Sequence, residues 1–391
     1  MTSDPREIRR IWSVHSGHSR SPWYRGLRFD LSKDNIITAT DNREHARLRN
    51  HVLPGYRGRG LENRQEGLID AQLVKFLALI EGKYISSASA LRPLDMSTAM
   101  QYLAQDVISA IEFDAPFGYL DVDSDKYGVI AIFESLLGLV MTLALFPFLV
   151  KCLGSPLMRP LLPRPSDPTG PGRLVGLVGE HVDSRYGENK IRKNDVLQSF
   201  VDSGLSRQDV ESEALIHLIG GTDTTAAAMR YAVFFVASNA VAYRKLQAEI
   251  DATVAEIGLS PSAIVPEHRL RAMPYLQAVI KESMRLWPPA MTLAARMSDQ
   301  DDVVCGLKVP AGTHITWAAC AIMKDQGVFG VDADVFVPER WLEAEPERIK
   351  ATEEVQGLVF AGGTLWECLG RRLALMEIGK TIFEVRYLGY K

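Results

Sequence analysis

Residues 360–372 combine one cysteine, Cys368, with three glycines and the beginning of a helical pattern. A thiolate at a helix N-terminus is stabilised by the positive end of the helix dipole. Glycines allow the preceding loop to lie flat against a planar cofactor and to aim backbone N–H groups at the sulfur. A single soft thiolate suits haem iron, where it favours cleavage of the O–O bond. The alternative is a buried structural cysteine after a turn, which is the usual role of a lone cysteine.

A second group, residues 220–225 (Gly-Gly-Thr-Asp-Thr-Thr), lies inside a long apolar helical pattern. Two glycines in a helix interior cost roughly 1 kcal/mol each relative to alanine, so a reason such as the close approach of a flat ligand is needed. An acid beside an alcohol, here Asp223 and Thr224, can relay protons into a dry pocket. The alternative is an N-cap that begins a new helix after a Gly-Gly turn.

Two further groups of residues indicate no particular function by themselves. Glu282 and Arg285 are three residues apart on a predicted helix and therefore share a face, but an exposed ion pair is the commoner interpretation of this spacing. Residues 338–341 (Pro-Glu-Arg-Trp) form a charged turn with an aromatic anchor. The remaining cysteines, Cys152, Cys305 and Cys320, form no C-x-x-C pair, so the sequence favours neither a disulfide scaffold nor a zinc site.

The elements that must position these groups are mainly helical. A pattern of about 30 residues, from Ser206 to Ser238, is long enough to be a central buried helix. Asp209 would complete a weak capping box with Ser206. Short strands are predicted at residues 303–304 and 307–309. Further helical patterns cover residues 42–53, 98–113, 126–146, 275–286 and 368–383.

Length and composition place bounds on the kind of protein. The chain has 391 residues, of which 47% are apolar and 24% charged, as in an average globular protein with a sizeable core. A net charge of -4 gives no indication of a nucleic-acid partner. We expect one domain over residues 1–391, in which the proline-rich residues 163–172 form a surface loop and not a linker. A reducing compartment is expected from the cysteines.

The most apolar stretch, residues 136–150, is interrupted by Pro147 and is shorter than the ~20 residues that cross a bilayer. We interpret it as a buried or interfacial helix. Together with the loop that follows, residues 136–158 are expected to make peripheral contact with a membrane surface. The N-terminal residues show no targeting signal or anchor.

Taken together, the four groups resemble the motifs of the cytochromes P-450 in order and spacing. That family carries A/G-G-x-D/E-T-T, then E-x-x-R, then P-E-R-F/W, and finally F-x-x-G-x-R-x-C-x-G. The match spans about the last half of the chain. Residues 44–54 also resemble the family's W-x-x-x-R helix, with His45 and Arg49 at the tryptophan and arginine positions. The whole is similar to filamentous-fungal members such as pisatin demethylase.

The resemblance implies a mainly α fold with a minor β-sheet, the triangular helical haem domain of the family. It implies a haem-thiolate monooxygenase that inserts one oxygen atom from O2 into a lipophilic small molecule of fungal secondary metabolism. Electrons would come from NADPH through a reductase, at the surface of the endoplasmic reticulum.

The resemblance also implies roles for individual residues. Cys368 would ligate the haem iron, and Asp223 with Thr224 would deliver protons to bound oxygen. Glu282, Arg285 and Arg340 would form a buried structural ion network. The residues implied to face the haem or its propionates are His45, Arg49, Gly220, Gly221, Arg296 and Trp366.

The chain departs from the family pattern in the cysteine loop. Trp366 replaces the arginine two places before the cysteine, although its indole N–H can still reach a propionate. Thr364 stands at the glycine position and Phe360 is one place early, which indicates a one-residue shift in the loop.

The resemblance places a membrane anchor and the first strands before Met1, and further strands after Lys391, so the chain is expected to be incomplete at both ends. The alternative function is therefore a degenerate or truncated relative that binds haem weakly or not at all. An all-helical interaction scaffold would leave Gly220, Gly221 and the cysteine loop unexplained.

Overall fold

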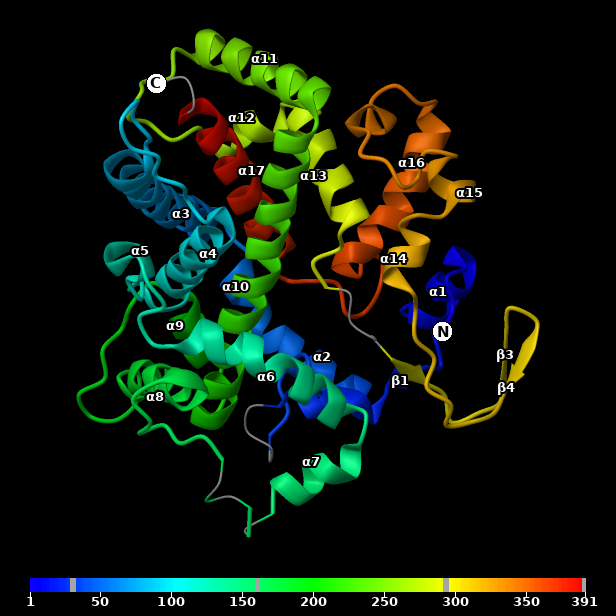
Figure 1. The fold of residues 1–391 in the computed structure, drawn as a ribbon. Helices are drawn as coiled ribbons and strands as arrows, with labels where there is room; N and C mark the ends of the chain where they lie inside the picture. The colour runs from blue at the N-terminus through cyan, green and yellow to red at the C-terminus, as the bar shows by residue number, and fades with distance from the viewer. Residues whose placement is uncertain (29–32, 156, 159, 161, 291–294, 389–391) are drawn as a thin grey trace.

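A computed structural model of the protein describes residues 1–28, 33–155, 157–158, 160, 162–290 and 295–388, and these are mainly helical (Figure 1). The α-helices are α1 (Pro5–Trp12), α2 (Asn42–Val52), α3 (Arg59–Leu79), α4 (Met96–Phe113), α5 (Tyr119–Val122), α6 (Val129–Ala144), α7 (Pro147–Leu153), α8 (Gly170–Asp183), α9 (Val196–Asp202), α10 (Arg207–Ser238), α11 (Ala240–Ile257), α12 (Glu267–Arg271), α13 (Pro274–Leu286), α14 (Ala319–Ile322), α15 (Gln326–Phe329), α16 (Pro346–Gln356) and α17 (Arg371–Leu388). Short helical turns are η1 (Pro22–Leu27), η2 (Leu53–Tyr56), η3 (Ile80–Tyr84), η5 (Pro338–Trp341) and η6 (Gly357–Phe360).

The long helix α10 runs through the middle of the molecule, and α4, α8, α13 and α17 pack against it (Figure 1). Its N-cap, Ser206, accepts the Asp209 N–H at 3.2 Å, so the predicted start of the helix is confirmed. Residues 220–225 lie in the interior of this unbroken helix. The alternative of an N-cap after a Gly-Gly turn is therefore wrong.

Two small antiparallel sheets complete the described part of the chain. Strands β3 (Asp302–Val304) and β4 (Leu307–Val309) form the predicted hairpin, turning at Cys305 and Gly306, both of which have positive φ. Strand β1 (Ser19–Arg20) pairs with β2 (Arg296–Met297), and Arg20 lies directly opposite Arg296. This second pairing joins segments far apart in the sequence and brings two arginines together.

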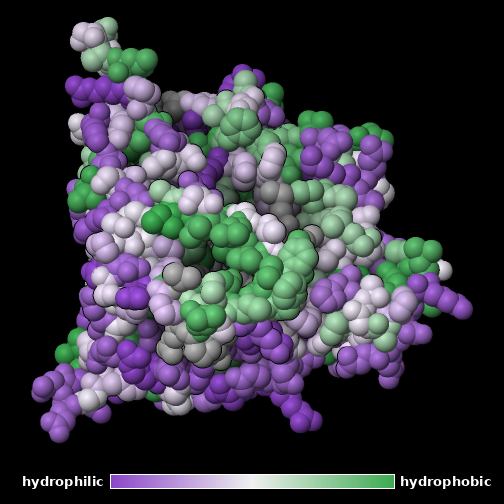
Figure 2. Space-filling view, turned by 60° about the horizontal axis from the view of Figure 1, so that its bottom comes forward, coloured by the Kyte–Doolittle hydropathy of each residue, from purple (hydrophilic) through white to green (hydrophobic). Residues whose placement is uncertain are grey.

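The apolar stretch forms α6 and α7 and remains largely exposed. Leu139, Leu145, Phe146 and Phe148 are each about half exposed or more. When the bottom of Figure 1 is brought forward, apolar residues gather in the centre of that face (Figure 2). The expectation of a core helix is therefore wrong for most of this stretch, and the interfacial interpretation agrees with the exposure.

The proline-rich segment packs on α8 because two glycines of that helix leave room for its backbone. A Cβ atom at Gly172 would lie 2.3 Å from the Arg164 carbonyl oxygen, and one at Gly176 would lie 2.2 Å from that of Pro165. Real Cβ atoms do not come so close, so glycine is required at both positions. The segment is thus fixed against a helix.

Among the described residues, no single helix is both long and apolar enough to cross a membrane. Two consecutive helices, Arg207–Ser238 and Ala240–Ile257, would be long and apolar enough together, but they meet at a sharp bend and qualify by length and composition alone.

Candidate functional site

Cys368 lies at the end of a tight loop, directly before α17. Its N–H donates to the Phe360 carbonyl oxygen at 2.9 Å, which closes the loop. Ala361 and Gly363 take positive φ values of 53° and 74°, whereas Thr364 does not and instead donates its hydroxyl to the Ala361 carbonyl. Thr364 therefore closes the turn from within, and Gly363 supplies the left-handed residue one place earlier than the family pattern has its glycine.

Opposing effects act on the pKa of the Cys368 thiol. The side chain is exposed, yet the protein around it is close enough for burial to raise the pKa of the thiol. The backbone N–H groups of Gly370 and Arg371, at the start of the helix, and the nearby Arg49 guanidinium act in the opposite direction. A thiolate here is stabilised by N–H groups and by a metal ion bound to it.

Three arginines from different segments lie beside the cysteine loop, and we call Arg20, Arg49 and Arg296 the cation cluster. Arg20 and Arg296 are buried, and Arg49 is half-buried. The Trp366 ring contacts two of them, with its centroid 3.8 Å from the Arg296 guanidinium carbon and 5.5 Å from that of Arg20. Residues from four separate parts of the chain thus converge next to Cys368.

Within the described residues, none of the arginines of the cation cluster forms an ion pair. The Glu367 carboxylate, which attracts the half-buried Arg49, is itself paired with Arg371. Burial lowers the pKa of Arg20 to about 9, and repulsion by Arg296 and Arg49 contributes to this. The Nε atoms of Arg20 and Arg296 and the Trp366 Nε1 are buried without a hydrogen-bond partner among the described atoms. Such groups cost stability unless an anion binds them.

His45 faces the same cluster from α2. Its imidazole is buried, and its ring centroid lies 6.0 Å from that of Trp366. Burial, followed by repulsion from the three arginines, lowers the pKa of His45 to about 3, so the ring is neutral at pH 7. A neutral imidazole offers one N–H donor without adding a fourth positive charge.

These observations test whether the site fits haem. A haem group brings a soft iron atom and two propionate carboxylates. The thiol before α17 suits the iron, and the unpaired guanidinium and indole N–H groups suit the propionates. The donor set therefore fits the group that the sequence pattern implies.

On α10 the predicted residues have different surroundings. Thr224 donates its hydroxyl to the Gly220 carbonyl at 2.6 Å, and a Cβ at Gly220 would meet nothing within 4 Å. At Gly221, by contrast, a Cβ would lie 2.6 Å from the Ile108 side chain of α4. At Gly221 the absent side chain therefore serves the packing of α10 on α4, and the expectation that Gly220 and Gly221 face the haem stays a prediction.

Asp223 is exposed and points toward α4. Its Oδ1 accepts a hydrogen bond from Gln101 Nε2 at 3.4 Å, and the Arg230 guanidinium donates to the amide oxygen of the same glutamine. The acid and the Thr224 hydroxyl are thus adjacent in sequence but bind different partners.

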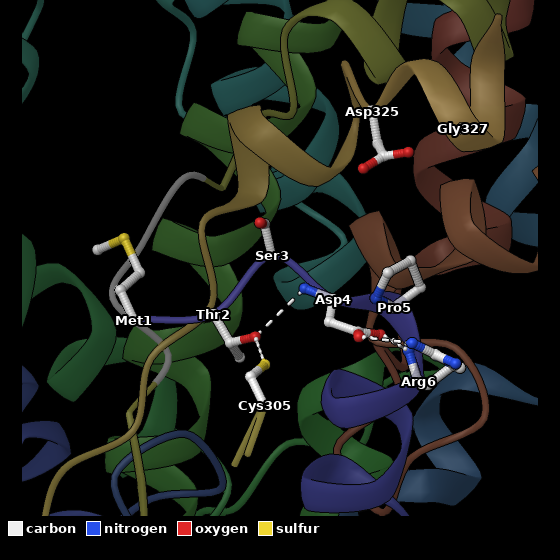
Figure 3. Close-up of a pocket in the computed structure, with 9 residues that line it drawn as sticks. All are labelled: Met1, Thr2, Ser3, Asp4, Pro5, Arg6, Cys305, Asp325 and Gly327. Atoms are coloured by element: carbon white, nitrogen blue, oxygen red, sulfur yellow. Dashed lines mark hydrogen bonds and ion pairs between the residues drawn. The ribbon is translucent and has the colours of Figure 1, made fainter. Parts of the chain in front are cut away.

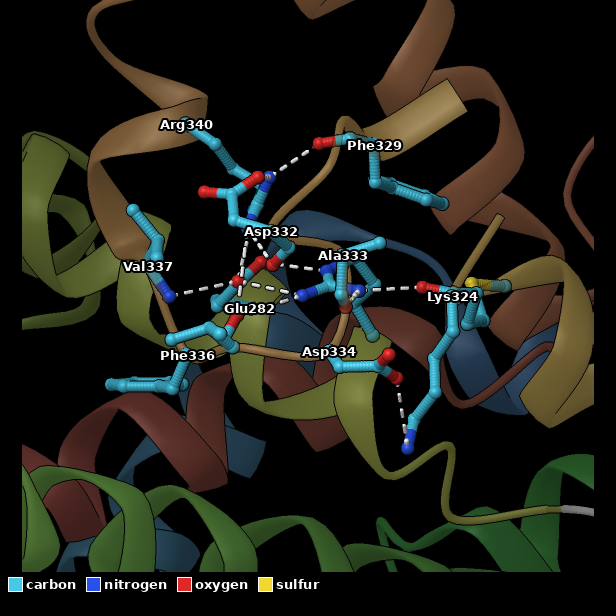
Figure 4. A network of polar contacts seen from close by, with 12 residues as sticks. Glu282, Lys324, Phe329, Asp332, Ala333, Asp334, Phe336, Val337 and Arg340 are labelled. Atoms are coloured by element: carbon cyan, nitrogen blue, oxygen red, sulfur yellow. Dashed lines mark hydrogen bonds and ion pairs between the residues drawn. The ribbon is translucent and has the colours of Figure 1, made fainter. Parts of the chain in front are cut away.

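Glu282, Arg285 and Arg340 come together in a buried network (Figure 4). Arg285 donates to both Glu282 carboxylate oxygens at 2.8 Å, and Arg340 Nε donates to Glu282 Oε1 at 2.9 Å. The Trp341 indole adds a third donor at 3.0 Å. The side chains of Glu282 and Arg285 are 0% exposed, so the alternative of an exposed pair is wrong.

Arg285 and Arg340 also bind the backbone of the segment that leads toward the cysteine loop. The carbonyl oxygens that accept from them are those of Met323, Phe329, Asp332, Ala333 and Val335. A buried carboxylate with this many donors is well compensated.

Sequence reasoning missed Arg20, which belongs to a two-residue strand without periodicity. It also missed Tyr24, whose hydroxyl accepts from Arg296 Nη1 at 3.3 Å, and Gln101. No motif marks these positions; the only signal was an arginine in an aromatic-rich N-terminal segment.

A surface hollow of about 800 Å³ lies elsewhere, between the N-terminal residues and the β3–β4 turn (Figure 3). Residues 1–6, Cys305, Asp325 and Gly327 line it, and Thr2 Oγ1 lies 3.4 Å from Cys305 Sγ. None of the predicted site residues lines this hollow, so it is separate from the cysteine site.

Comparison with known proteins agrees with this geometry. The family model for Cytochrome P450 matches residues 12–385. Cytochrome P450 monooxygenase ABA1 of Pyricularia oryzae is 36% identical over 390 residues, which cover 98% of this chain and 76% of that protein. Cytochrome P450 monooxygenase aba1 of Botryotinia fuckeliana is 34% identical, with the same two coverages. Cytochrome P450 monooxygenase abl1 of Leptosphaeria maculans is 33% identical over 388 residues, which cover 98% of this chain and 67% of that protein.

The mainly helical fold, the cysteine before α17 and the family match over most of the chain agree with one another. The chain therefore belongs to the cytochrome P450 family of haem-thiolate monooxygenases.

Proposed function

We propose that residues 1–391 form one haem-binding domain that oxidises a lipophilic small molecule of fungal secondary metabolism. The observation that carries this proposal is the cation cluster beside Cys368, in which buried arginines lack any carboxylate partner within the described residues. Two haem propionates would supply the missing charge.

Cys368 would hold the iron through its thiolate, and the N–H groups of Gly370 and Arg371 would limit the charge on the sulfur. Arg20, Arg49, Arg296 and the Trp366 and His45 N–H groups would orient the propionates. When bound, haem supplies the activation of O2 and the insertion of one oxygen atom into the substrate.

Asp223 and Thr224 would manage protons on α10. The Thr224 hydroxyl is bonded to the Gly220 carbonyl, which leaves its oxygen free to accept a proton donor from the site side. The exposed Asp223 carboxylate can exchange protons with solvent and pass them inward by a change of rotamer.

The Glu282–Arg285–Arg340 network would act structurally. It joins α13 to the segment that leads to the cysteine loop, and the side chains of Glu282 and Arg285 are 0% exposed. Substitution of one of these residues would leave a buried charge without its partner. It would therefore lower the stability of the fold as well as the activity.

A monooxygenase of this kind needs an electron donor. We propose NADPH, acting through a reductase, as the source for this chain. The exposed apolar side chains of α6 and α7 would dock on a membrane, which we propose to be the surface of the endoplasmic reticulum, where a lipophilic substrate partitions.

The test is the ferrous–carbon monoxide spectrum of purified protein reconstituted with haem. The unsubstituted chain should give the thiolate-type band, and Cys368→Ala should abolish it. Cys305→Ala is the matched control, because this cysteine is also exposed but lies at the β3–β4 turn. A thiolate-type band that survives in Cys368→Ala would refute the assignment, and an unsubstituted chain that takes up no haem would favour the degenerate relative.

A further inference from the structure

Residues 35–39, which we call the strap, form a compact turn that closes on itself. The fully buried Asn35 accepts the N–H groups of Ile37 and Thr38 through its side-chain oxygen, each at 3.0 Å. Its carbonyl accepts the N–H of Ala39 at 2.9 Å. Within the backbone of this turn, the Ile36 N–H and the outward carbonyls therefore need partners from outside; the Asn35 Nδ2 is buried without a partner among the described atoms.

Two side chains, those of Arg20 and Glu213, supply those partners. Arg20 Nη1 donates to the carbonyl oxygens of Ile36 and Ile37, at 2.6 and 2.8 Å. On α10, Glu213 Oε1 accepts the Ile36 N–H at 2.9 Å. The strap thus lies between β1 and α10. Arg20 of β1 and Glu213 of α10 bond to it.

The Arg20 guanidinium also has nitrogen atoms that form no hydrogen bond to the strap. All of its hydrogen bonds to the strap come from Nη1, whereas its Nε is buried without a partner among the described atoms. The same guanidinium lies in the cation cluster, opposite Arg296 across the β1–β2 pair. Like charges that face each other across strands repel, and a bound anion removes this cost.

We propose that Arg20 is a positioning residue that couples the binding of haem propionates in the cation cluster to the attachment of the strap on α10. This inference rests on the proposed function, because it takes haem as the anion. With both propionates bound, Arg20 is held between anion and strap. Without them, repulsion from Arg296 and Arg49 displaces its guanidinium, and the strap carbonyls lose their donor.

The consequence for the site follows from the place of Glu213. It lies seven residues, about two helical turns, before Gly220 on α10, so both residues share a face of that helix. A strap fixed at Glu213 therefore lies on the same face of α10 as Gly220, to which the Thr224 hydroxyl is bonded, about two helical turns away. Haem loading would order this wall of the site before any substrate arrives.

The experiment is hydrogen exchange of the strap amides in the full chain, measured without ligand, with haem, and with protoporphyrin IX. The iron-free porphyrin carries both propionates but cannot bind Cys368 through a metal. Exchange in residues 36–39 should slow by about tenfold or more with either ligand. In Arg20→Ala saturated with haem, it should stay as fast as in the ligand-free chain.

Arg49→Ala is the matched control, because Arg49 belongs to the cation cluster but donates to the Glu367 carbonyl and not to the strap. Once saturated with haem, this variant should keep strap protection. Arg20→Lys covers the case in which the alanine variant does not fold. A lysine ammonium is a point charge that lacks the guanidinium fork, so its strap protection should be intermediate.

Equal strap exchange with and without ligand would overturn the coupling, as would full protection in Arg20→Ala. Protection by haem but not by protoporphyrin IX would also overturn it, because the effect would then belong to the iron–sulfur bond. A thiolate-type carbon monoxide spectrum with an unprotected strap would refute the coupling alone. Failure of both ligands to bind would refute the proposed function as well.

Discussion

At the scale of single residues, the Thr224 hydroxyl has a defined place. It is bonded to the Gly220 carbonyl one turn earlier and not to Asp223, which instead contacts Gln101. The hydroxyl oxygen can therefore accept a proton donor from the site, while the acid faces solvent. Asp223 is exposed, so the desolvation cost of its charge is low, and the hydrogen bond from Thr224 to Gly220 is exposed as well.

We predict that Thr224→Ala uncouples electron use from product formation. Loss of a positioned proton-transfer group slows that step by roughly 10²-fold or more, so reduced oxygen should escape as peroxide. Peroxide and product are measured per NADPH consumed. Thr224→Ser keeps the hydroxyl and should restore most of the coupling; equal coupling in all three proteins would leave Thr224 with a role in helix geometry only.

The motifs identified several residues that the structure brings together. Cys368, Trp366, His45, Arg49 and Arg296 all lie in one region, because their spacing within known motifs survives in this chain. Arg20 could not be found in this way. Its role depends on a strand pairing across 276 positions, between Arg20 and Arg296, and on the aromatic rings around it, and neither leaves a periodic trace in the sequence.

At the scale of elements, the neighbouring glycines of α10 form a matched pair. Gly221→Ala places a Cβ against Ile108 of α4 and should destabilise the protein by about 1–3 kcal/mol through overpacking. Gly220→Ala meets open space and should stabilise the haem-free chain by up to about 1 kcal/mol through helix propensity. Urea denaturation of both variants checks this. A similar change in the free energy of unfolding of both variants would mean that the Ile108 side chain of α4 moves to accommodate the added methyl group.

The apolar surface of α6 and α7 gives a second prediction for an element. The chain should float with liposomes, and Phe146→Ser combined with Phe148→Ser should leave it in the soluble fraction. Val331→Ser is the control, since Val331 is 91% exposed but lies outside α6 and α7. If the double variant floats as well as the unsubstituted chain, Phe146 and Phe148 do not make the membrane contact.

Sequence patterns predicted the elements around the motifs well. The predicted helices over residues 98–113 and 275–286 correspond to α4 and α13 within two residues, and the hairpin at Gly306 is confirmed. The helix predicted from residue 126 begins at Val129, because Gly128 takes a positive φ of 63° and interrupts it. Helix α3 was not anticipated: Gly60 and Gly67 weaken its local propensity, and packing on α4 and α17 stabilises it.

At the scale of the whole molecule, buried ionisable groups make stability depend on pH. Burial raises the pKa of Glu213 from 4.5 to about 8, so the folded chain keeps a proton that the unfolded chain has lost. Its contribution to stability is full below pH 4.5, falls as pH rises through the window from 4.5 to 8, and is lost above it.

We therefore predict that Glu213→Gln gains stability relative to the unsubstituted chain as pH rises from 5 to 8. The difference reaches about 5 kcal/mol at most, since each unit between two pKa values is worth about 1.4 kcal/mol. Denaturant midpoints measured at several pH values check this, and comparing the two proteins at each pH cancels other groups. A constant difference would mean that Glu213 titrates alike in both states.

The facing arginines of β1 and β2 have a consequence for the protein inside a cell. A ladder of two residues with like charges cannot hold by itself, and a ligand that binds only the folded state adds about 1.4 kcal/mol of stability for each tenfold excess over its dissociation constant. When haem is scarce, newly made chains should open at this pairing and be degraded sooner. The abundance of the protein would then follow the supply of its cofactor without any change in transcription.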